Sequence, residues 1–162
     1  MHFSVKQTTL VYVFNPQWQI LLAAKKKTNS GFNISLGKWN GAGGKVEEDE
    51  TYLQSAKREL EEETGICIDE SKFIHMGIIH FSFATKKEWD QECHVFVVKD
   101  YTGAFHETEE MKPQWFDTTT LPYDDMRADD KYRLPRLLNN EKLEYMFHFS
   151  DEGDILSYER LL

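Results

Sequence analysis

The 162-residue sequence has few cysteines and no long apolar run. Its two cysteines, Cys67 and Cys93, stand apart without CxxC spacing, so neither a zinc site nor a disulfide framework is indicated. Reduced thiols are the default in a cytosolic protein. The N-terminus lacks the charged-then-apolar pattern of a signal peptide, and no segment approaches membrane-spanning length. We therefore expect a cytoplasmic protein with no membrane partner.

Basic residues are also in the minority, because 19 Lys and Arg face 28 Asp and Glu, which gives a net charge of −9. Tracking a nucleic-acid backbone needs basic patches, so a nucleic-acid polymer is not an expected partner. A small phosphorylated substrate remains compatible, since a bound metal inverts the local field. The hydrophobic content of 40% predicts a packed globular fold, which we expect to be one domain spanning 1–162 and a monomer.

The stretch 44–66 carries the clearest chemistry. Read as a helix from about Thr51 to Thr64, it places Glu59, Glu62 and Glu63 at i, i+3 and i+4, which are neighbours on a helix surface. Three adjacent carboxylates repel one another unless a cation lies among them, and Mg²⁺ takes such oxygen ligands. A solvated acidic face is the alternative reading. The opposite face is apolar and a glycine follows the helix: Leu53, Ala56, Leu60 and Gly65.

Nine positions of this stretch match the Nudix box, and the chain therefore resembles the Nudix hydrolases: Gly44, Glu50, Arg58, Glu59, Leu60, Glu62, Glu63, Gly65 and Ile66. The resemblance implies an α/β fold of the α+β kind, in which a mixed β-sheet is sandwiched between helices. It also implies a loop–helix–loop that binds Mg²⁺, or Mn²⁺, and hydrolyses a nucleoside diphosphate linked to another group.

The resemblance assigns roles to the charged residues of the box. Glu59, Glu62 and Glu63 hold the metal, helped by the backbone carbonyl of Gly43. Arg58 orients a glutamate by bidentate pairing, and the remaining box glutamate holds the loop against the helix. The general base is one of three acids, which the sequence leaves open: Glu62, Glu63 or Glu110.

Three segments are similar to the members of this family that hydrolyse oxidised purine nucleoside triphosphates: 37–51, 109–117 and 121–132. This similarity implies release of pyrophosphate from a modified purine nucleoside triphosphate, in sanitation of the nucleotide pool. The rivals are a Nudix pyrophosphatase acting on an unmodified triphosphate or another nucleoside diphosphate derivative, and a non-catalytic nucleotide sensor. The complete set of acids argues against the sensor. The expected substrate contacts are Thr9, Lys25, Asn40, Phe81, Phe83, Arg127, Asp129 and Asp130.

Several of these residues also have a purely structural reading. The runs 8–14 and 19–24 predict a hairpin that ends in three lysines, which form either a solvated edge or a cationic wall. Lys25 is the best placed of the three, and 28–37 is expected to be a loop at the mouth of the site. Asn40 is a turn residue or a contact to a base. Segment 38–45 holds three glycines, which permit close backbone approach to a ligand but lack P-loop spacing.

The remaining segments predict two further strands, a helix and a hairpin. Strands are expected at 73–84 and 93–98, where Phe81 and Phe83 belong to the core or line the base pocket. His75, His80 and His94 lack ligand spacing and are read as structural. Glu110 lies in an acidic loop or adds a carboxylate to the metal. A hairpin is expected from 142–149 and 155–161.

A helix is predicted at 126–138, with Asp129 and Asp130 near its start. Acids there complement the helix dipole, whereas the resemblance implies that this pair hydrogen-bonds the purine edge. One departure stands beside the pair. The resembled enzymes stack a Trp on the purine two residues earlier, where this sequence has Arg127, and Arg133 matches a second aromatic. A guanidinium can stack on a base but also brings charge and donors.

Overall fold

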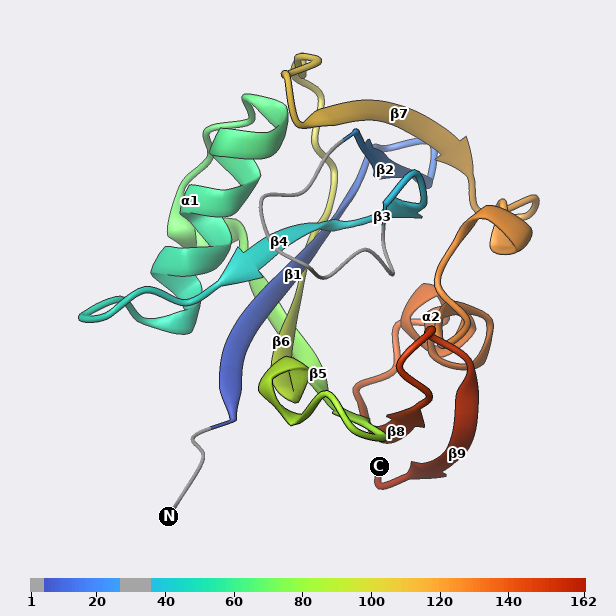
Figure 1. Cartoon of the computed structure of the whole chain (residues 1–162). Helices are drawn as coiled ribbons and strands as arrows, with labels where there is room; N and C mark the ends of the chain where they lie inside the picture. The colour runs from blue at the N-terminus through green and yellow to red at the C-terminus, as the bar shows by residue number, and fades with distance from the viewer. Residues whose placement is uncertain (1–4, 27–35) are drawn as a thin grey trace.

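The computed structural model describes residues 5–26 and 36–162 (Figure 1), and this part of the chain holds two α-helices and nine strands. The helices are α1 (Tyr52–Thr64) and α2 (Asp130–Leu138), with short 3₁₀ turns at Glu70–Lys72, Lys87–Trp89 and Tyr123–Asp125. The strands are β1 (Lys6–Phe14), β2 (Gln19–Lys25), β3 (Trp39–Asn40), β4 (Ala42–Lys45), β5 (Ile74–Phe83), β6 (Gln91–Val98), β7 (Met111–Asp117), β8 (Leu143–Phe149) and β9 (Ile155–Arg160).

The strands form one mixed sheet in the order β3-β2-β1-β6-β5-β8-β9, with β4 added beside β1 and β7 beside β2. β1 is parallel to β6 and β5 is parallel to β8, whereas the other pairs are antiparallel. One side of β1 is shared, because it pairs with β2 at Val13 and Phe14 and with β4 from Thr8 to Val11. This shared edge positions the site described below.

The two faces of the sheet carry separate apolar clusters, and the alternating side chains of β1 contribute to both. Leu10, Tyr12 and Phe14 belong to the cluster that includes Leu134 and Leu137 of α2. Val11 and Val13 belong to the cluster that includes α1. Successive strand side chains point to opposite faces, so one strand serves both cores. The expected sheet between helices is confirmed, and Figure 1 shows α1 and α2 on opposite sides of it.

Local signals set both ends of α1 as the sequence predicted. Thr51 caps the helix, because its hydroxyl accepts the N–H of Gln54 while the Gln54 side chain accepts the N–H of Thr51. Gly65 ends the helix in the left-handed region with φ 77°. The inward face packs as expected, with Ala56 and Leu60 buried and Leu53 half-buried against the same cluster.

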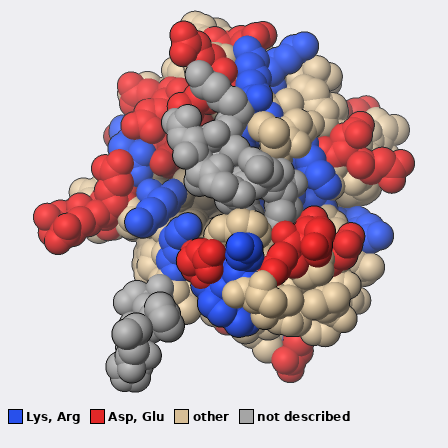
Figure 2. All heavy atoms as spheres, in the orientation of Figure 1, with Lys and Arg blue, Asp and Glu red and all other residues tan. Residues whose placement is uncertain are grey.

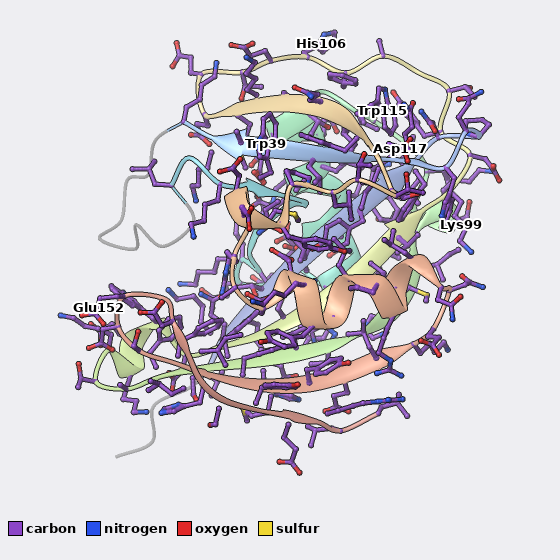
Figure 3. The ribbon with its side chains drawn as sticks, turned by 90° about the vertical axis from the view of Figure 1, so that its right-hand side faces the viewer. Trp39, Lys99, His106, Trp115, Asp117 and Glu152 are labelled. Atoms are coloured by element: carbon purple, nitrogen blue, oxygen red, sulfur yellow. The ribbon has the colours of Figure 1, made fainter. Side chains whose placement is uncertain are left out.

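The start of α2 differs from the predicted range 126–138. The helix begins at Asp130, because Tyr123–Asp125 forms a 3₁₀ turn and Met126 after it is extended, with φ −121° and ψ 170°. Asp129 lies at the N-cap position, but its side chain makes no capping hydrogen bond. Neither aspartate therefore caps the helix through its side chain. Figure 3 looks onto α2, with β7 on one side of it and the β8–β9 hairpin on the other.

The structure also bears on the expectations for the cysteines, the histidines, the final hairpin and membrane-spanning helices. Both cysteines are free thiols, and His75 Nε2 lies 3.0 Å from Nδ1 of the buried His94. The hairpin after α2 is confirmed as β8 and β9. Lys27 and most of the expected loop 28–37 lie outside the described residues. Within the described residues, no helix has both the length and the apolar character needed to cross a membrane.

Leu60 offers a direct test of how α1 is held. Its side chain is 1% exposed in the α1-side cluster, so Leu60→Ala should lower the free energy of unfolding by about 2–5 kcal/mol. Leu156→Ala, at a side chain that is 56% exposed, should change it by less than about 0.5 kcal/mol. Urea unfolding followed by circular dichroism measures both. Equal stability losses in the two variants would contradict this packing.

Candidate functional site

A single arginine on α1 gathers several of the box glutamates. Arg58 donates from Nε and a terminal nitrogen to both carboxylate oxygens of Glu50, at 2.7 and 2.9 Å. Its other terminal nitrogen donates to Glu59 at 2.8 Å and to Glu62 at 3.2 Å. The expected bidentate pairing is present, and its partner is Glu50. These contacts lower the pKa of Glu50 to about 2, chiefly through the hydrogen bond from Arg58.

The same arginine joins the helix to the preceding strand. A terminal nitrogen donates to the Lys45 carbonyl at 3.2 Å, so β4, the loop after it and α1 are held by one side chain. The loop exposes further acids, Glu47, Glu48 and Asp49. Figure 2 shows acidic side chains gathered over α1 and this loop, with basic side chains on the neighbouring surface.

Glu63 points inward from α1 toward β4. Its Oε1 accepts the Gly43 N–H at 2.8 Å, and the residue is 6% exposed. Burial, helped by the nearby charges of Glu59 and Glu110, raises the pKa of Glu63 to about 8, although the hydrogen bond from Gly43 and the charge of Lys25 act to lower it. Burial also raises the pKa of Glu59. Burial therefore disfavours the ionised forms of Glu59 and Glu63 unless a metal cation lies beside them.

The glycines of β4 are required by this close approach. A Cβ on Gly43 would lie 1.9 Å from the Thr9 carbonyl oxygen, and one on Gly44 would lie 2.5 Å from Glu59 Oε1. Only glycine lets the strand pass between β1 and the α1 carboxylates. The sequence predicted that these glycines permit close approach to a ligand. In this structure the groups that come close are the Thr9 backbone and the Glu59 side chain.

A cavity of about 250 Å³ lies beside the β4 glycines. Residues from every strand beside β1 line it, together with two arginines near α2. The lining includes several cations and, among the described residues, no Asp or Glu. The lining residues are Lys6, Thr8, Thr9, Leu10, Ala23, Lys25, Lys38, Asn40, Gly41, Gly43, Gly44, Lys45, Phe81, Gln91, Cys93, Met111, Arg127 and Arg133.

One end of the cavity is closed by a buried ion-pair cluster. Arg133, 1% exposed, donates to Asp129 at 2.7 Å, to Asp130 at 2.6 Å and to the Tyr12 hydroxyl at 3.0 Å. Both aspartates are fully buried. Burial raises the pKa of Asp130 to about 6 despite Arg133, whereas for Asp129 the charges of Arg133 and Arg127 outweigh burial and lower the pKa.

Arg127 forms the other guanidinium of this wall. Its Cζ lies 4.6 Å from the Phe81 ring centroid and 5.6 Å from that of Phe149, and its Nε lies 3.4 Å from Asp129 Oδ1. Phe83, expected on the same face as Phe81, is fully buried farther along β5. It packs against Trp89 and Phe149 and is not part of the cavity lining.

The structure brings together Lys25, Asn40, Phe81, Arg127 and Gly43, all of which line the cavity. Thr9 lines the cavity as well, and its hydroxyl shares a 3.2 Å hydrogen bond with Ser55 of α1. Asp129 and Asp130 pair with the arginines and are not part of the lining.

The sequence reasoning did not single out Thr8, Gln91 and Cys93 as site residues. The Thr8 hydroxyl donates to Gln91 at 3.4 Å, and Thr8 pairs with Cys93 across the parallel β1–β6 ladder. Alternation along each strand was visible in the sequence, but the pairing of two strands about eighty residues apart was not.

Glu110 lies just before β7, and its carbonyl accepts the Lys26 N–H at 2.7 Å. Its charge contributes to the raised pKa of Glu63, so the two carboxylates lie near one another. The Lys26 side chain forms an ion pair with Glu107.

The carboxylates do not converge on one point in this structure. Among the described residues, no group of three His, Cys, Asp or Glu side chains is gathered as a metal cage. The reason is local, since Glu59 and Glu62 turn to Arg58 and Glu63 turns to the Gly43 N–H. The donor set nonetheless fits a hard divalent ion, because it is made of oxygen atoms whose negative charge is only partly compensated.

The fold and this arrangement of acids define a Nudix protein, and a NUDIX domain model matches residues 5–137, so the chain belongs to the Nudix family. It is 43% identical over 151 residues to the oxidized purine nucleoside triphosphate hydrolase of Mus musculus, which covers 93% of this chain and 90% of that protein. The corresponding protein of Danio rerio is 39% identical over 157 residues, 97% of this chain and 95% of that one. The mutator MutT protein of Bacillus halodurans superimposes with a TM-score of 0.78 at 25% identity, covering 97% of this chain and 98% of that one.

The raised pKa of Glu63 predicts a cost to the metal-free protein. The folded state holds the proton up to about pH 8, whereas the unfolded chain releases it near 4.5. Stability is therefore lost as pH rises between these values, with an upper bound of about 3 kcal/mol at pH 7. Glu63→Gln, which keeps an acceptor for the Gly43 N–H, should raise the Tm of the metal-free protein at pH 8.

The control is Glu61→Gln, at an exposed neighbour on α1, which should leave the Tm within about one degree because surface substitutions change stability little. Thermal melts in a chelator and in saturating Mg²⁺ separate charge repulsion from metal binding. In Mg²⁺ the gain from Glu63→Gln should shrink or reverse, since only wild type keeps all its ligands. A lower Tm for Glu63→Gln in chelator would contradict the assignment.

Proposed function

We propose that this Nudix hydrolase cleaves a modified purine nucleoside triphosphate to the monophosphate and pyrophosphate. The observation that carries the proposal is the position of the β4 glycines. They separate a glutamate cluster, held by Arg58, from a cavity lined with lysines and an aromatic ring. The names of the mouse and zebrafish relatives, both oxidized purine nucleoside triphosphate hydrolases, support the substrate class.

The phosphates belong at the glycine end of the cavity. Lys25, Lys38 and Lys45 line the cavity together with Gly43 and Gly44. Lys25 is close enough to Glu63 for its charge to lower the pKa of that residue. A locally cationic lining in a protein of net charge −9 is what an anionic substrate requires.

In this proposal Glu59, Glu62 and Glu63 hold Mg²⁺, or Mn²⁺, with Glu110 and the Gly43 carbonyl as further ligands. When bound, the ion neutralises charge on the phosphates and lowers the pKa of the attacking water. Arg58 positions Glu59 and Glu62 through hydrogen bonds of 2.8 and 3.2 Å. Glu62, Glu63 or Glu110 accepts the proton of the attacking water.

The base belongs at the other end, against Phe81 and Asn40. Phe81 presents a ring in the lining and Asn40 presents an amide. Four expected substrate contacts take supporting roles. Thr9 ties β1 to α1, Phe83 supports the aromatic row behind Phe81, and Asp129 with Asp130 holds Arg133 in the wall.

The test of the proposed function is pyrophosphate release in Mg²⁺ across a set of triphosphates: 8-oxo-dGTP, 2-oxo-dATP, O6-methyl-dGTP and the four ordinary dNTPs. At least one modified purine should give a higher kcat/KM than its ordinary counterpart, with the monophosphate and pyrophosphate as products. A nucleoside-diphosphate sugar is the control for the wider Nudix chemistry. Turnover of the sugar alone would refute the proposal while leaving the family assignment intact.

The role of the glutamates has its own test. Glu62→Gln should lower kcat by about 10²-fold or more, because it removes a metal ligand or the general base, and the Tm should change little because Glu62 is exposed. Glu61→Gln is the matched control, since it makes the same change on the adjacent residue, which is also exposed. Unchanged turnover in Glu62→Gln would remove this residue from the catalytic set.

A further inference from the structure

Ser55 is a polar side chain on the face of α1 that packs against the sheet. It is fully buried, and its hydroxyl lies 3.2 Å from the hydroxyl of Thr9 on β1, which is 3% exposed. The neighbouring buried residues of the helix, Ala56 and Leu60, are apolar. Burying a hydroxyl costs desolvation, which the hydrogen bond with Thr9 offsets. The pair therefore adds direction, rather than apolar contact area, to the packing of α1 on β1.

This hydroxyl pair lies at the turn of α1 that carries the site. Ser55 is three residues before Arg58 and four before Glu59, so these side chains are neighbours on the helix surface. Thr9 pairs with Gly44 across the β1–β4 ladder, and a Cβ on Gly44 would lie 2.5 Å from Glu59 Oε1. The pair therefore joins the helix to β1 beside the point where Glu59 approaches β4.

Ser55 also contacts the glutamate that holds Arg58. The pKa of Glu50 is lowered chiefly by its hydrogen bond with Arg58, and a side-chain hydrogen bond with Ser55 acts in the same direction. An ionised carboxylate only accepts hydrogen bonds, and a serine hydroxyl has one proton to donate. Ser55 therefore donates to Glu50 and accepts from Thr9. A chain of hydrogen bonds thus runs from β1 to the guanidinium.

Another contact between α1 and the sheet is made by a proposed metal ligand. Glu63 accepts the Gly43 N–H at 2.8 Å, and in the proposed function the same carboxylate binds the metal. That contact is therefore open to rearrangement when a cation arrives. The Ser55–Thr9 pair includes no proposed ligand, so it holds the helix in one place with and without the cation.

We infer that Ser55 is a positioning residue for the divalent metal site, because its hydrogen bond with Thr9 sets the rotation of α1 that directs the carboxylates toward β4. This role rests on the proposed function and belongs to a residue outside the cavity lining. Apolar contacts are non-directional and tolerate small rotations of a helix. A hydrogen bond weakens as it bends, so it selects one rotation. The carboxylate oxygens move most when the helix turns, since they lie far from its axis.

Two variants separate positioning from the cost of burying polar groups. Ser55→Ala leaves the Thr9 hydroxyl unpaired in the interior and should lower the Tm. The double variant Thr9→Val/Ser55→Ala removes both hydroxyls and leaves an apolar pair, so it should recover most of the lost Tm. Tyr52→Phe is the matched control, because it removes the hydroxyl of another hydrogen bond between α1 and β1, the exposed one to Gln7 at 3.0 Å.

The experiment measures Mn²⁺ binding without nucleotide, from the electron paramagnetic resonance signal of the free ion, at a temperature well below the Tm of every variant. Ser55→Ala and the double variant should both raise the Kd for Mn²⁺ by about tenfold or more, the loss typical when a group that supports metal ligands is removed. Tyr52→Phe should match wild type in Kd and in Tm. Thermal melts in a chelator supply the Tm values.

The double variant decides between positioning and mutual pairing of the hydroxyls. A restored Tm with weakened Mn²⁺ binding supports positioning, because no buried hydroxyl is then left unpaired. Wild-type Mn²⁺ affinity in the double variant, or a Tm that stays low, overturns the positioning role. An unchanged Kd in Ser55→Ala also overturns it, and so does loss of folding in both variants. Absence of Mn²⁺ binding in wild type would instead refute the metal site of the proposed function, and the positioning role with it.

Discussion

The geometry of the site depends on the contact between one guanidinium and the glutamates around it. Arg58 is bound to Glu50 through both oxygens and reaches Glu59 and Glu62 from the same side. Like charges at i and i+3 on a helix repel, so without this cation the carboxylates would separate into solvent. With it, α1 presents its acids beside β4, and the clustered carboxylates suit a divalent cation.

The second constraint is the way β1 serves both faces of the sheet. Its alternate side chains belong to the α1 core and to the α2 core, and the cavity is lined by residues from both sets, Leu10 from one and Thr9 from the other. Contact between the two faces passes through Gly43 and Gly44, where the absence of a side chain lets the backbone touch Glu63 on one side and border the cavity on the other. The proposed reaction requires the two regions to be this close, because the metal would bind the phosphates of a nucleotide whose nucleobase lies in the cavity.

How much the sequence predicts follows from whether the determining interactions are local. The bounds of α1 and the Gly65 stop depend on neighbouring residues, and the sequence predicted them to within a residue. The start of α2 was missed because a 3₁₀ turn and an extended Met126 precede it. The surroundings of Asp129 and Asp130 could not be read either, since Arg133 turns them inward and Tyr12, from the opposite end of the chain, completes the cluster. Long-range strand pairing decides the rest of the cavity.

The central claim is that the α1 acids form a divalent metal site beside the glycines of β4. Its most direct test is a crystal structure with Mn²⁺ and a non-hydrolysable triphosphate, measured at a wavelength where manganese scatters anomalously. The account predicts an anomalous peak coordinated by oxygens of Glu59, Glu62 and Glu63, with the phosphates on the side of Gly43 and Gly44. A nucleotide bound without such a peak, or a peak coordinated by other residues with Arg58 still holding Glu59 and Glu62, would contradict it.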